Sequence, residues 1–275
     1  MTPTLAPEES TATSSRSLMR CVGCGASLVG EAVCRNCGRA TPESQGIHEA
    51  IILPLEGRNR VAHAFYESKA WRRFQPWERV FLFIQGPGEA SARRQVLWHL
   101  GSSERKRILE VGIGDGANVP LLPTGWELHG LDFSKKRLER CRDRWPSMAG
   151  RLTWGEAERL PFEDAAFDGV FTVGGINYFR DPFVALAEMR RVTRPGGVMV
   201  AADERADLFR LSLGHALGLE WLDVWSLRLM GLDPKFLDMV LHDAGPVEAA
   251  AHAVWPRHRR VPIWNRLGYC LVDVG

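Results

Sequence analysis

Short apolar runs alternate with amphipathic stretches from residue 107 onward. The short runs predict strands at Arg107–Val111, Trp126–Leu131, Arg151–Trp154, Phe167–Val173 and Gly197–Ala202. The stretches with helical spacing predict a helix that starts at Gly116–Leu122 and two more at Ser134–Trp145 and Pro182–Val192. Strands that alternate with helices at this pitch are typical of a parallel sheet with helices on both faces. The pattern therefore predicts an α/β fold with a doubly wound, Rossmann-like, mostly parallel sheet.

Two further helical regions flank this pattern. Residues 59–104 are rich in aromatic side chains, so we expect one face of these N-terminal helices to be buried. Residues 205–256 mix apolar and aromatic positions with charges, which is consistent with helices that cover a substrate pocket or extend the core. Arg259–Val272 is interpreted as two antiparallel strands around Trp264-Asn265-Arg266. We assign residues 59–275 to one domain.

Four of the six cysteines form two C-x-x-C pairs, Cys21 with Cys24 and Cys34 with Cys37. Two such pairs suit a tetrahedral thiolate site for zinc better than disulfides in a reducing compartment, although a redox dithiol pair stays open. Four thiolates leave no open coordination position, so the predicted Zn²⁺ is structural. Residues 20–40 are too few to bury a core of their own, and metal binding would supply most of their folding free energy. We therefore predict a small zinc ribbon over residues 20–40.

The remaining N-terminal residues carry little pattern. Residues 1–19 are rich in Ser, Thr and Pro without an apolar stretch or a basic start, which predicts a disordered tail and no secretory signal. Residues 41–58 are interpreted as a linker. The longest apolar run has five residues, at Val80–Ile84 and again at Val198–Ala202, far below the roughly 20 of a membrane span. We expect a cytoplasmic protein without a membrane span.

Composition excludes some classes of function. The chain has 35 basic and 33 acidic residues and a net charge of +2, with 45% hydrophobic residues. These values are ordinary for a globular protein and exclude a wholly disordered or fibrous chain. The near balance of charge argues against a protein held on nucleic acid by its overall charge.

A glycine-rich turn follows the first predicted strand of the alternating region. The segment Ile108–Asn118 runs from a strand through Gly112, Gly114 and Gly116 into the predicted helix. Glycine lets the backbone pass close to a ligand, and a helix start offers unpaired N–H groups to it. Asp132 ends the next strand, where a carboxylate accepts the two hydroxyls of a ribose, a group common to NAD and S-adenosylmethionine (SAM). Glu110 precedes the turn, and its charge would favour a cationic ligand and oppose a pyrophosphate.

Further motifs follow in order. They are Gly155-Glu-Ala-Glu-Arg-Leu-Pro-Phe162, Phe167-Asp-Gly-Val170 and Arg190-Arg-Val-Thr-Arg-Pro-Gly-Gly197. With the glycine turn and Asp132, residues 107–204 resemble the class I SAM-dependent methyltransferases, and most of all the branch with the ubiquinone and menaquinone C-methyltransferases. The resemblance implies a seven-stranded sheet and a methyltransferase that uses SAM.

The resemblance also implies roles for individual residues. The methionine side of SAM would lie at Glu110, Gly112, Gly114 and Gly116, and its ribose at Asp132. The adenine would lie beside Phe133, with Glu156 near its amino group and a backbone contact from Ala157. Relatives usually have Asp where this chain has Glu156. The loop that starts at Thr172 is where cofactor and acceptor meet in relatives, and Phe65-Tyr66-Glu67 resembles part of a helix that closes over SAM.

Methyl transfer is an in-line displacement, so the enzyme mainly holds the nucleophile, methyl and sulfur nearly collinear. A general base is needed only for an acceptor that is protonated at neutral pH. Asn177 and Tyr178 follow the fourth strand of the alternating region and are our candidates for positioning the acceptor. His63 and His215 are weaker candidates, while Cys141 and Cys270 are interpreted as buried small side chains. The favoured acceptor is a small apolar or aromatic molecule.

Other hypotheses stay open at this point. A ribosomal or transfer RNA methyltransferase would use the zinc ribbon and residues 58–107, which hold eleven basic and four acidic residues. A zinc-ribbon interaction protein would only sense SAM. An NAD oxidoreductase is opposed by Glu110 and by the lack of a second catalytic domain. The sequence alone indicates neither the acceptor atom nor the oligomeric state.

Overall fold

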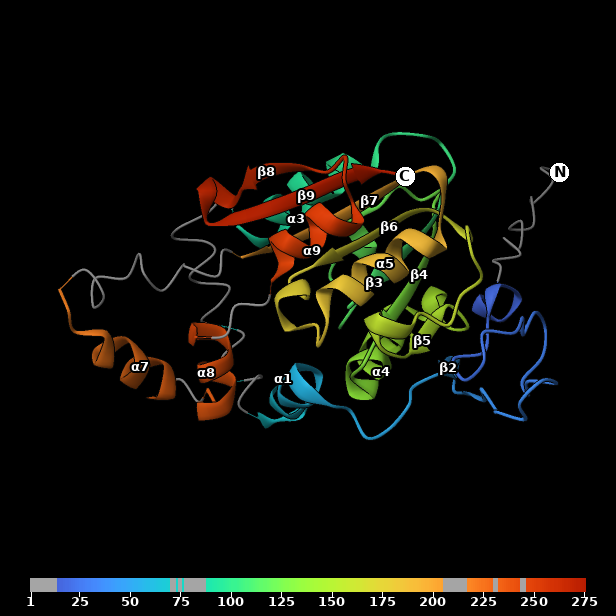
Figure 1. The fold of residues 1–275 in the computed structure, drawn as a ribbon, viewed down its shortest axis with the longest axis horizontal. Helices are drawn as coiled ribbons and strands as arrows, with labels where there is room; N and C mark the ends of the chain where they lie inside the picture. Colours follow the sequence, from blue (N-terminus) through green and yellow to red (C-terminus); the bar gives the residue numbers. More distant parts are fainter. Residues whose placement is uncertain are drawn as a thin grey trace, which may run out of the picture.

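The computed structural model of the protein describes residues 14–69, 73, 76, 88–204, 217–229, 232–242 and 246–275. Within them, nine strands form a single sheet in the order β1-β2-β5-β4-β3-β6-β7-β9-β8 (Figure 1). The strands are β1 (Glu43–Ser44), β2 (Ile47–Glu49), β3 (Arg107–Val111), β4 (Glu127–Asp132), β5 (Leu152–Trp154), β6 (Phe167–Val173), β7 (Thr193–Glu204), β8 (Arg259–Ile263) and β9 (Gly268–Val274). Strands β2 to β7 pair in parallel, while β9 is antiparallel to both of its neighbours.

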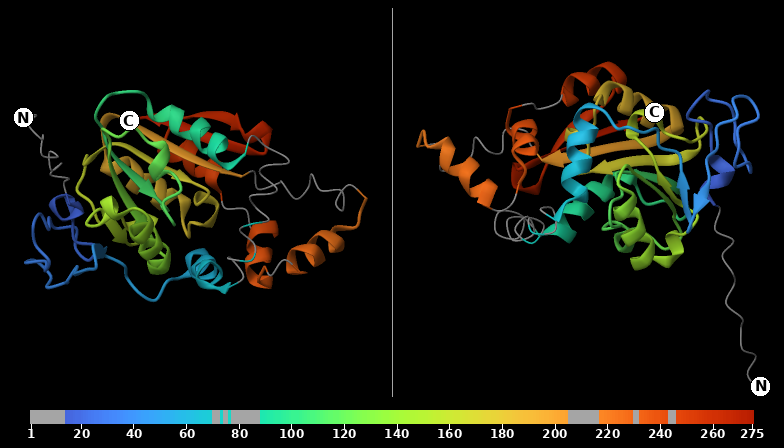
Figure 2. Two further views of the ribbon diagram at one scale, coloured as in Figure 1. Left: turned by 180° about the vertical axis from the view of Figure 1, so that it is seen from behind. Right: turned by 90° about the horizontal axis from the view of Figure 1, so that it is seen from below.

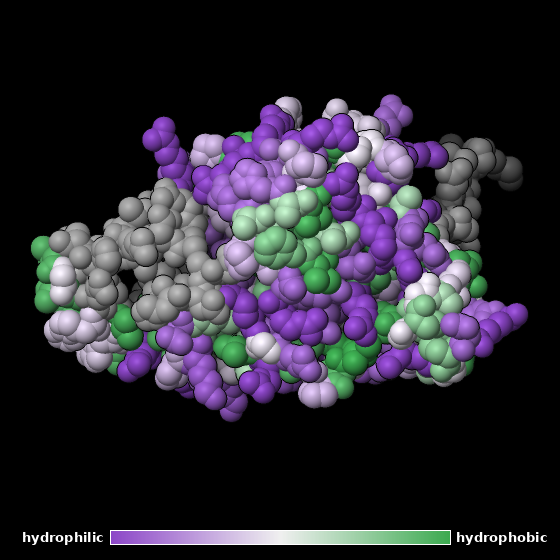
Figure 3. Space-filling model, viewed as in Figure 1, coloured by the Kyte–Doolittle hydropathy of each residue, from purple (hydrophilic) through white to green (hydrophobic). Residues whose placement is uncertain are grey.

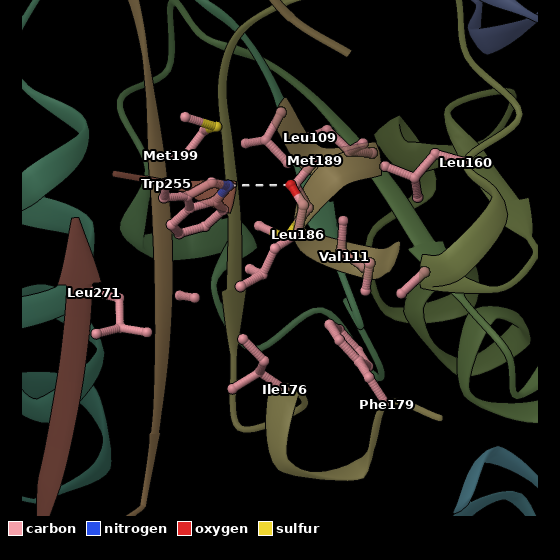
Figure 4. Packing of buried hydrophobic residues seen from close by; sticks show 14 of the residues in the cluster. Leu109, Val111, Leu160, Ile176, Phe179, Leu186, Met189, Met199, Trp255 and Leu271 are labelled. Carbon is pink, nitrogen blue, oxygen red and sulfur yellow. Dashed lines mark hydrogen bonds between the residues drawn. The ribbon is translucent and has the colours of Figure 1, made fainter. Parts of the chain in front are cut away.

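Helices cover both faces of the sheet, as the alternating pattern predicts. Helices α5 (Pro182–Val192) and α9 (Val247–Val254) pack on one face in a core that includes Trp255, whose indole N–H donates to the Leu186 carbonyl at 3.0 Å (Figure 4). Helices α3 (Glu89–Leu97) and α4 (Lys135–Arg144) contribute to the core on the other face. The seven neighbouring strands β5-β4-β3-β6-β7-β9-β8 have the arrangement expected of the class I methyltransferase fold.

A third group of helices lies beyond the sheet. Helix α1 (Gly57–Glu67) packs against α8 (Pro234–His242). Helix α7 (Glu220–Leu229) lies at the opposite end of the molecule from residues 20–40, which we call the four-cysteine module (Figure 2). The predicted helical patterns of residues 70–87 and 205–216, including His215, lie outside the described residues apart from positions 73 and 76. In the view of Figure 3 the surface is mostly hydrophilic, with an apolar area over α9. None of the helices in the described ranges is both long and apolar enough to cross a membrane.

The helix predicted to start at Gly116–Leu122 is wrong. The chain forms turns and one short 3-10 helix, Val119–Leu121, before it enters β4. Pro120 and Pro123 explain the difference, because proline lacks the N–H of a helical hydrogen bond and its ring clashes with the preceding turn. The N–H groups of a following helix therefore do not contribute to this glycine turn.

The predicted tail and linker also differ from the structure. Ser15–Leu18 form a 3-10 helix (η1) with Ser15 fully buried, so the tail does not extend to residue 19. Within the predicted linker, β2 pairs in parallel with β5 and adds to the sheet beside the seven expected strands. Burial of Ile47 and His48 explains why this short segment is held as a strand.

Candidate functional site

The glycine turn after β3 shapes the middle of a cleft at the carboxyl end of the sheet. Gly112, Gly114 and Gly116 have φ values of 81°, 55° and 74°, which favour glycine. A Cβ at Gly112 would have Thr172 Oγ1 as its nearest neighbour at 3.8 Å, so this glycine borders open space. A Cβ at Gly116 would lie 2.7 Å from Cys141 Sγ, so this glycine lets the turn pack on α4. The two glycines therefore differ: Gly112 borders open space, and Gly116 allows close packing on α4.

Asp132 connects the glycine turn to the start of α4. Its Oδ2 accepts the Gly114 N–H and its Oδ1 accepts the Ser134 N–H, both at 2.8 Å. Burial raises the pKa of this carboxyl group, while the positive charge of Arg137 opposes that shift. Ser134 caps α4 by accepting the Arg137 N–H. Asp132 is therefore held at the tip of β4, where it lines the cleft.

Glu110 lies fully enclosed below the glycine turn. Its Oε1 accepts from Asn118 Nδ2 at 2.6 Å, and no hydrogen-bond partner reaches Oε2 among the described residues. Burial raises the pKa of Glu110 to about 8. The carboxyl group is thus largely protonated at neutral pH in the absence of a ligand, and the charge expected from the sequence requires a cation beside it. A second hollow, which Arg93 and Arg137 also line, adjoins Glu110 and Gly112.

The cleft brings together five of the predicted residues, Gly112, Asp132, Phe133, Ala157 and Tyr178. Gly114, Gly116, Glu156, Thr172 and Asn177 support these residues without lining this cleft. Thr172 is fully buried below Gly112, and its hydroxyl group has no partner among the described residues.

Asn177 is engaged with the sheet. Its Nδ2 donates to the Glu204 carbonyl at 3.0 Å, and its Oδ1 accepts from the Tyr269 hydroxyl at 3.1 Å. Its backbone N–H donates to Asp203 at 3.0 Å. These contacts connect the loop after β6 to β7 and β9, so the side chain holds the loop on which Tyr178 lies.

Asn59 is a site residue that sequence reasoning missed. It is buried at the start of α1 and lines the cleft. Its Nδ2 donates to Glu156 at 3.1 Å and to Glu158 at 3.0 Å, and its Oδ1 accepts the Arg180 N–H at 3.1 Å. The residue thus joins three segments that are far apart in the sequence, and no local motif marks it.

Aromatic side chains from α1 and α8 form a roof over one side of the cleft. The Phe236 ring stacks on Phe65 with a centroid distance of 3.9 Å and on Tyr178 at 5.5 Å. Tyr66 meets Tyr178 edge-on at 6.1 Å and lines the cleft. We call Phe65, Tyr66, Tyr178 and Phe236 the aromatic roof.

The end of α1 is fastened to α4. Glu67 accepts from the Ser134 hydroxyl group and forms an ion pair with Lys136 at 2.7 Å. Despite partial burial, these hydrogen bonds and the Lys136 charge lower the pKa of Glu67. His63 lies on the same helix with its ring 5.9 Å from that of Phe133, outside the residues that line the cleft. The segment Phe65-Tyr66-Glu67 therefore lies beside the cleft, where the resemblance to a closing helix would place it.

The four N-terminal cysteines converge on one point. Their sulfur atoms all lie within 4.8 Å of one another, with Cys21 3.5 Å from Cys37 and Cys24 3.6 Å from Cys34. Hydrogen bonds from Asn36 and from the Ala26 backbone lower the pKa of Cys24 to about 6. At Cys37 the hydrogen bond of the Arg39 backbone, which lowers the pKa, is outweighed by hydrogen bonds with Cys21 and Cys24, which raise the pKa to about 12. Such a cluster fits a tetrahedral metal ion. Cys141 and Cys270 are buried elsewhere, as predicted.

Comparison with known proteins gives matches in the central part of the chain. The family described as a methyltransferase domain matches residues 109–201. The demethylmenaquinone methyltransferase of Renibacterium salmoninarum is 38% identical over 112 residues, which cover 40% of this chain and 46% of that protein. That of Staphylococcus aureus (strain JH9) is 38% identical over 117 residues, covering 40% and 48%. The chain thus spans about half the length of these curated relatives.

Solved structures include similar chains as well. A crystal structure described as a putative SAM-dependent methyltransferase from Methanococcus maripaludis has a TM-score of 0.47 and 15% sequence identity, over 81% of this chain and 96% of that one.

Proposed function

We propose that the protein transfers a methyl group from SAM to a small, apolar acceptor with an aromatic or quinone-like ring, and the match of residues 109–201 to the methyltransferase domain family supports this proposal. The observation that carries the proposal is the cleft between Gly112, Asp132 and the aromatic roof. One wall is backbone and carboxylate, which suits a polar nucleoside, and the opposite side is aromatic.

The residues present fit SAM at several points. Gly112 offers backbone with open space before it, and the buried Glu110 Oε2, which has no hydrogen-bond partner among the described residues, could accept from an ammonium group. We assign the amino-acid part of SAM to the hollow beside Glu110 and Arg93, and its ribose to Asp132. Phe133 and Ala157 line the place where the adenine would lie. Glu156 lies next to Ala157 and accepts a hydrogen bond from Asn59.

SAM supplies a methyl group on a positively charged sulfur, which leaves with both electrons of the broken carbon–sulfur bond. The new bond forms between that methyl carbon and an electron pair of the acceptor. Among the described residues, the titratable side chains that line the cleft are Tyr66, Asp132, Arg137 and Tyr178. Histidine is absent from this set, so we infer an acceptor that reacts as an enolate or a phenolate and has given its proton to water before the transfer.

We assign separate roles to the two predicted catalytic residues. Tyr178 belongs to the aromatic roof and lines the cleft, so its ring positions the acceptor. Asn177 holds the loop through its contacts to β7 and β9. The names of the curated relatives, demethylmenaquinone methyltransferases, support a quinone-like ring as the acceptor.

For the cysteine cluster we propose a structural Zn²⁺ held by Cys21, Cys24, Cys34 and Cys37. All four ligands would be thiolates, and the cluster lies outside the residues that line the cleft. Metal analysis of the purified protein should give one zinc ion per chain.

Ion pairs within 3.4 Å engage five of the eight basic side chains of α3 and α4, which weakens the support for RNA as the acceptor. Arg93, Lys135, Lys136, Arg137 and Arg142 each have an acidic partner within 3.4 Å. Ion-paired side chains contribute less to a phosphate-binding surface than free cations do.

Transfer of a labelled methyl group tests the proposal. The purified protein is incubated with methyl-labelled SAM and a cell extract that is then separated into organic-soluble, RNA and protein fractions. We expect label in the organic-soluble fraction, and an Asp132→Ala variant as the control should lose it. Label confined to RNA or to protein would overturn the acceptor class. A folded protein with no affinity for SAM or S-adenosylhomocysteine would overturn the whole proposal.

A further inference from the structure

The loop between β5 and β6 forms one wall of the cleft. Gly155 and Ala157 line the cleft directly. Glu156 and Glu158 accept hydrogen bonds from Asn59, which connects this wall to α1. The position of the loop therefore affects both the width of the cleft and the attachment of the aromatic roof.

The other side of the same loop contacts the four-cysteine module. The Arg20 N–H donates to the Pro161 carbonyl at 3.1 Å, and the Glu163 N–H donates to the Leu18 carbonyl at 2.9 Å. The Arg20 guanidinium forms an ion pair with Asp164 at 2.5 Å. The contact thus includes backbone hydrogen bonds and a charged pair.

Apolar packing and a second arginine extend this contact. Met19, which is fully buried, forms a β-bridge with the equally buried Phe162. From the loop, Arg159 reaches back and donates to the Val22 carbonyl at 3.4 Å. Val22 lies between Cys21 and Cys24, so the hydrogen bond from Arg159 reaches the turn that carries two of the predicted zinc ligands.

The module depends on its cysteines for this shape. Its apolar cluster consists of only six buried residues, namely Met19, Cys21, Val22, Leu28, Cys34 and Ala50, with Ala26 and Ile52 at its edge. A core of this size contributes little folding free energy, so thiolate–metal bonds would keep the module folded. The Arg20 and Val22 backbone groups, which flank Cys21, are then ordered together with the metal site.

We propose that the metal-bound module is a positioning element for the cofactor cleft, which acts through Arg20 and Arg159 on the loop of residues 155–164. The inference rests on the proposed function, because it assigns the affected ligand as SAM. Loss of the metal loosens Arg20 and Val22, the loop loses one of its supports, and SAM binds more weakly.

A second support limits the size of the effect. From the domain side, Arg191 donates to the Leu160 carbonyl at 2.9 Å and to the Phe162 carbonyl at 2.7 Å, and it pairs with Asp164 at 2.8 Å. The loop therefore keeps one anchor when the module is disordered. We expect the affinity for the cofactor to fall by about threefold to tenfold, the range that the loss of a few partly exposed polar contacts produces.

The first experiment removes the metal from the full-length protein with a chelator. Isothermal titration measures the dissociation constant of S-adenosylhomocysteine, elemental analysis measures zinc, and hydrogen exchange follows residues 155–164. The proposal predicts weaker binding and faster exchange in this loop after zinc is removed. An unchanged dissociation constant in zinc-free, folded protein would overturn it. If the zinc-loaded protein does not bind S-adenosylhomocysteine at all, the proposed function fails instead.

The second experiment keeps the metal and removes the charged contact. Arg20→Met should retain zinc and raise the dissociation constant of S-adenosylhomocysteine by about threefold, since it removes a single partly exposed ion pair. Arg20→Lys should restore most of the affinity. The matched control is Arg35→Met, because Arg35 lies in the same module and pairs only with Glu31 in the described contacts. Equal affinities of Arg20→Met and Arg35→Met would refute the role of Arg20. In turnover assays the effect should appear in the KM for SAM and leave kcat unchanged.

Discussion

Glu110 is a carboxyl group whose protonation should be coupled to binding of the cofactor. Its pKa is raised to about 8 by burial. A cationic ammonium group beside Oε2 favours the ionised form, so binding lowers this pKa and releases a proton. At pH 7 about one tenth of the empty protein has ionised Glu110, and at pH 9 about nine tenths. We therefore expect the affinity for S-adenosylhomocysteine, relative to that of a Glu110→Gln variant, to rise about tenfold between these pH values.

Calorimetry in buffers of different ionisation enthalpy should measure the released proton directly. Glu110→Gln is the control: its affinity should be lower at high pH, and its remaining pH dependence is that of the ligand's own amine. The assignment of Glu110 to the ammonium group would be wrong if both proteins showed the same pH profile.

Gly112 and Gly116 should respond differently to the same substitution. Gly112→Ala leaves the new Cβ 3.8 Å from its nearest neighbour, so it costs stability only through the left-handed φ, about 1–2 kcal/mol. Gly116→Ala adds overlap with Cys141 and Trp145 and should destabilise the protein more. For ligand binding we expect Gly112→Ala to weaken S-adenosylhomocysteine at least tenfold, because Cβ projects where the ligand must approach.

Thermal unfolding and calorimetry of the two variants separate these effects. A Gly112→Ala variant that binds as tightly as the unmodified protein would show that the ligand does not approach this glycine.

Asn177 and Tyr178 are neighbours whose substitutions should affect different quantities. Asn177→Ala leaves the Tyr269 hydroxyl and the Glu204 carbonyl without this partner, which should cost about 1–3 kcal/mol of stability. Tyr178→Ala removes a ring of the aromatic roof and should raise the KM for the acceptor about tenfold, with Tyr178→Phe restoring it. Urea unfolding and steady-state kinetics measure the two effects. If Tyr178→Phe were as impaired as Tyr178→Ala, the hydroxyl and not the ring would position the acceptor.

At the scale of elements, a hydrogen bond between Ser15 and His129 holds the short helix η1 on strand β4. We call this contact the η1 clasp. The His129 Nε2–H donates to Glu127 at 2.8 Å, so Nδ1 accepts from the Ser15 hydroxyl at 2.8 Å. Burial lowers the pKa of His129 from its usual 6.5, an effect that outweighs the Glu127 charge, and this neutral form is needed to accept from Ser15. The hydrogen bond between Ser15 and His129 therefore forms only while the imidazole is neutral.

This arrangement predicts acid lability. Because the pKa of His129 is lower in the folded state, the unfolded chain binds the proton more readily below pH 6.5. The stability contributed by neutral His129 is complete above this pH and is lost as the pH falls, by at most about 1.4 kcal/mol per pH unit. Urea unfolding between pH 5 and 8 should show the slope, and His129→Gln should reduce it. Part of the slope should remain, because His48 has a lowered pKa from burial as well. An equal slope in both proteins would contradict this role for His129.

The elements that the sequence predicts correctly have continuous local signals. The apolar run of β6 and the capped helix α5 have the predicted bounds, Phe167–Val173 and Pro182–Val192. The helix after the glycine turn is wrong because Pro120 and Pro123 prevent it. Strand β2 has only three residues, too few to show an alternating pattern, and its pairing with β5 depends on contacts about a hundred residues away.

The same distinction applies to the candidate site. Gly112 and Asp132 belong to contiguous motifs at strand ends, and both line the cleft. Asn59 depends on three separate segments that the fold brings together, so its neighbours in the sequence give no indication of it. The aromatic roof likewise forms only when α1 and α8 pack together.

At the scale of the whole molecule, the N-terminal segment contains two parts with different relations to the α/β domain. The four-cysteine module contacts the domain through the loop of residues 155–164, through the η1 clasp and through the apolar packing of Ala50. Strand β2, in contrast, is part of the sheet: Ile47 is 1% exposed, and the Ala50 N–H extends the pairing with a hydrogen bond to Trp154. Lys135 of α4 also pairs with Glu49 at 2.6 Å.

Two truncations should therefore behave differently. A chain that starts at residue 41 keeps β1 and β2, and we expect it to unfold cooperatively at a lower Tm. A chain that starts at residue 57 loses Ile47 from the core and leaves the short strand β5 as an unprotected edge, which favours aggregation. Circular dichroism melting and size-exclusion chromatography distinguish them. If both chains melted alike and stayed monodisperse, residues 41–56 would be the passive linker that their sequence suggests, and the sheet would need only its seven central strands.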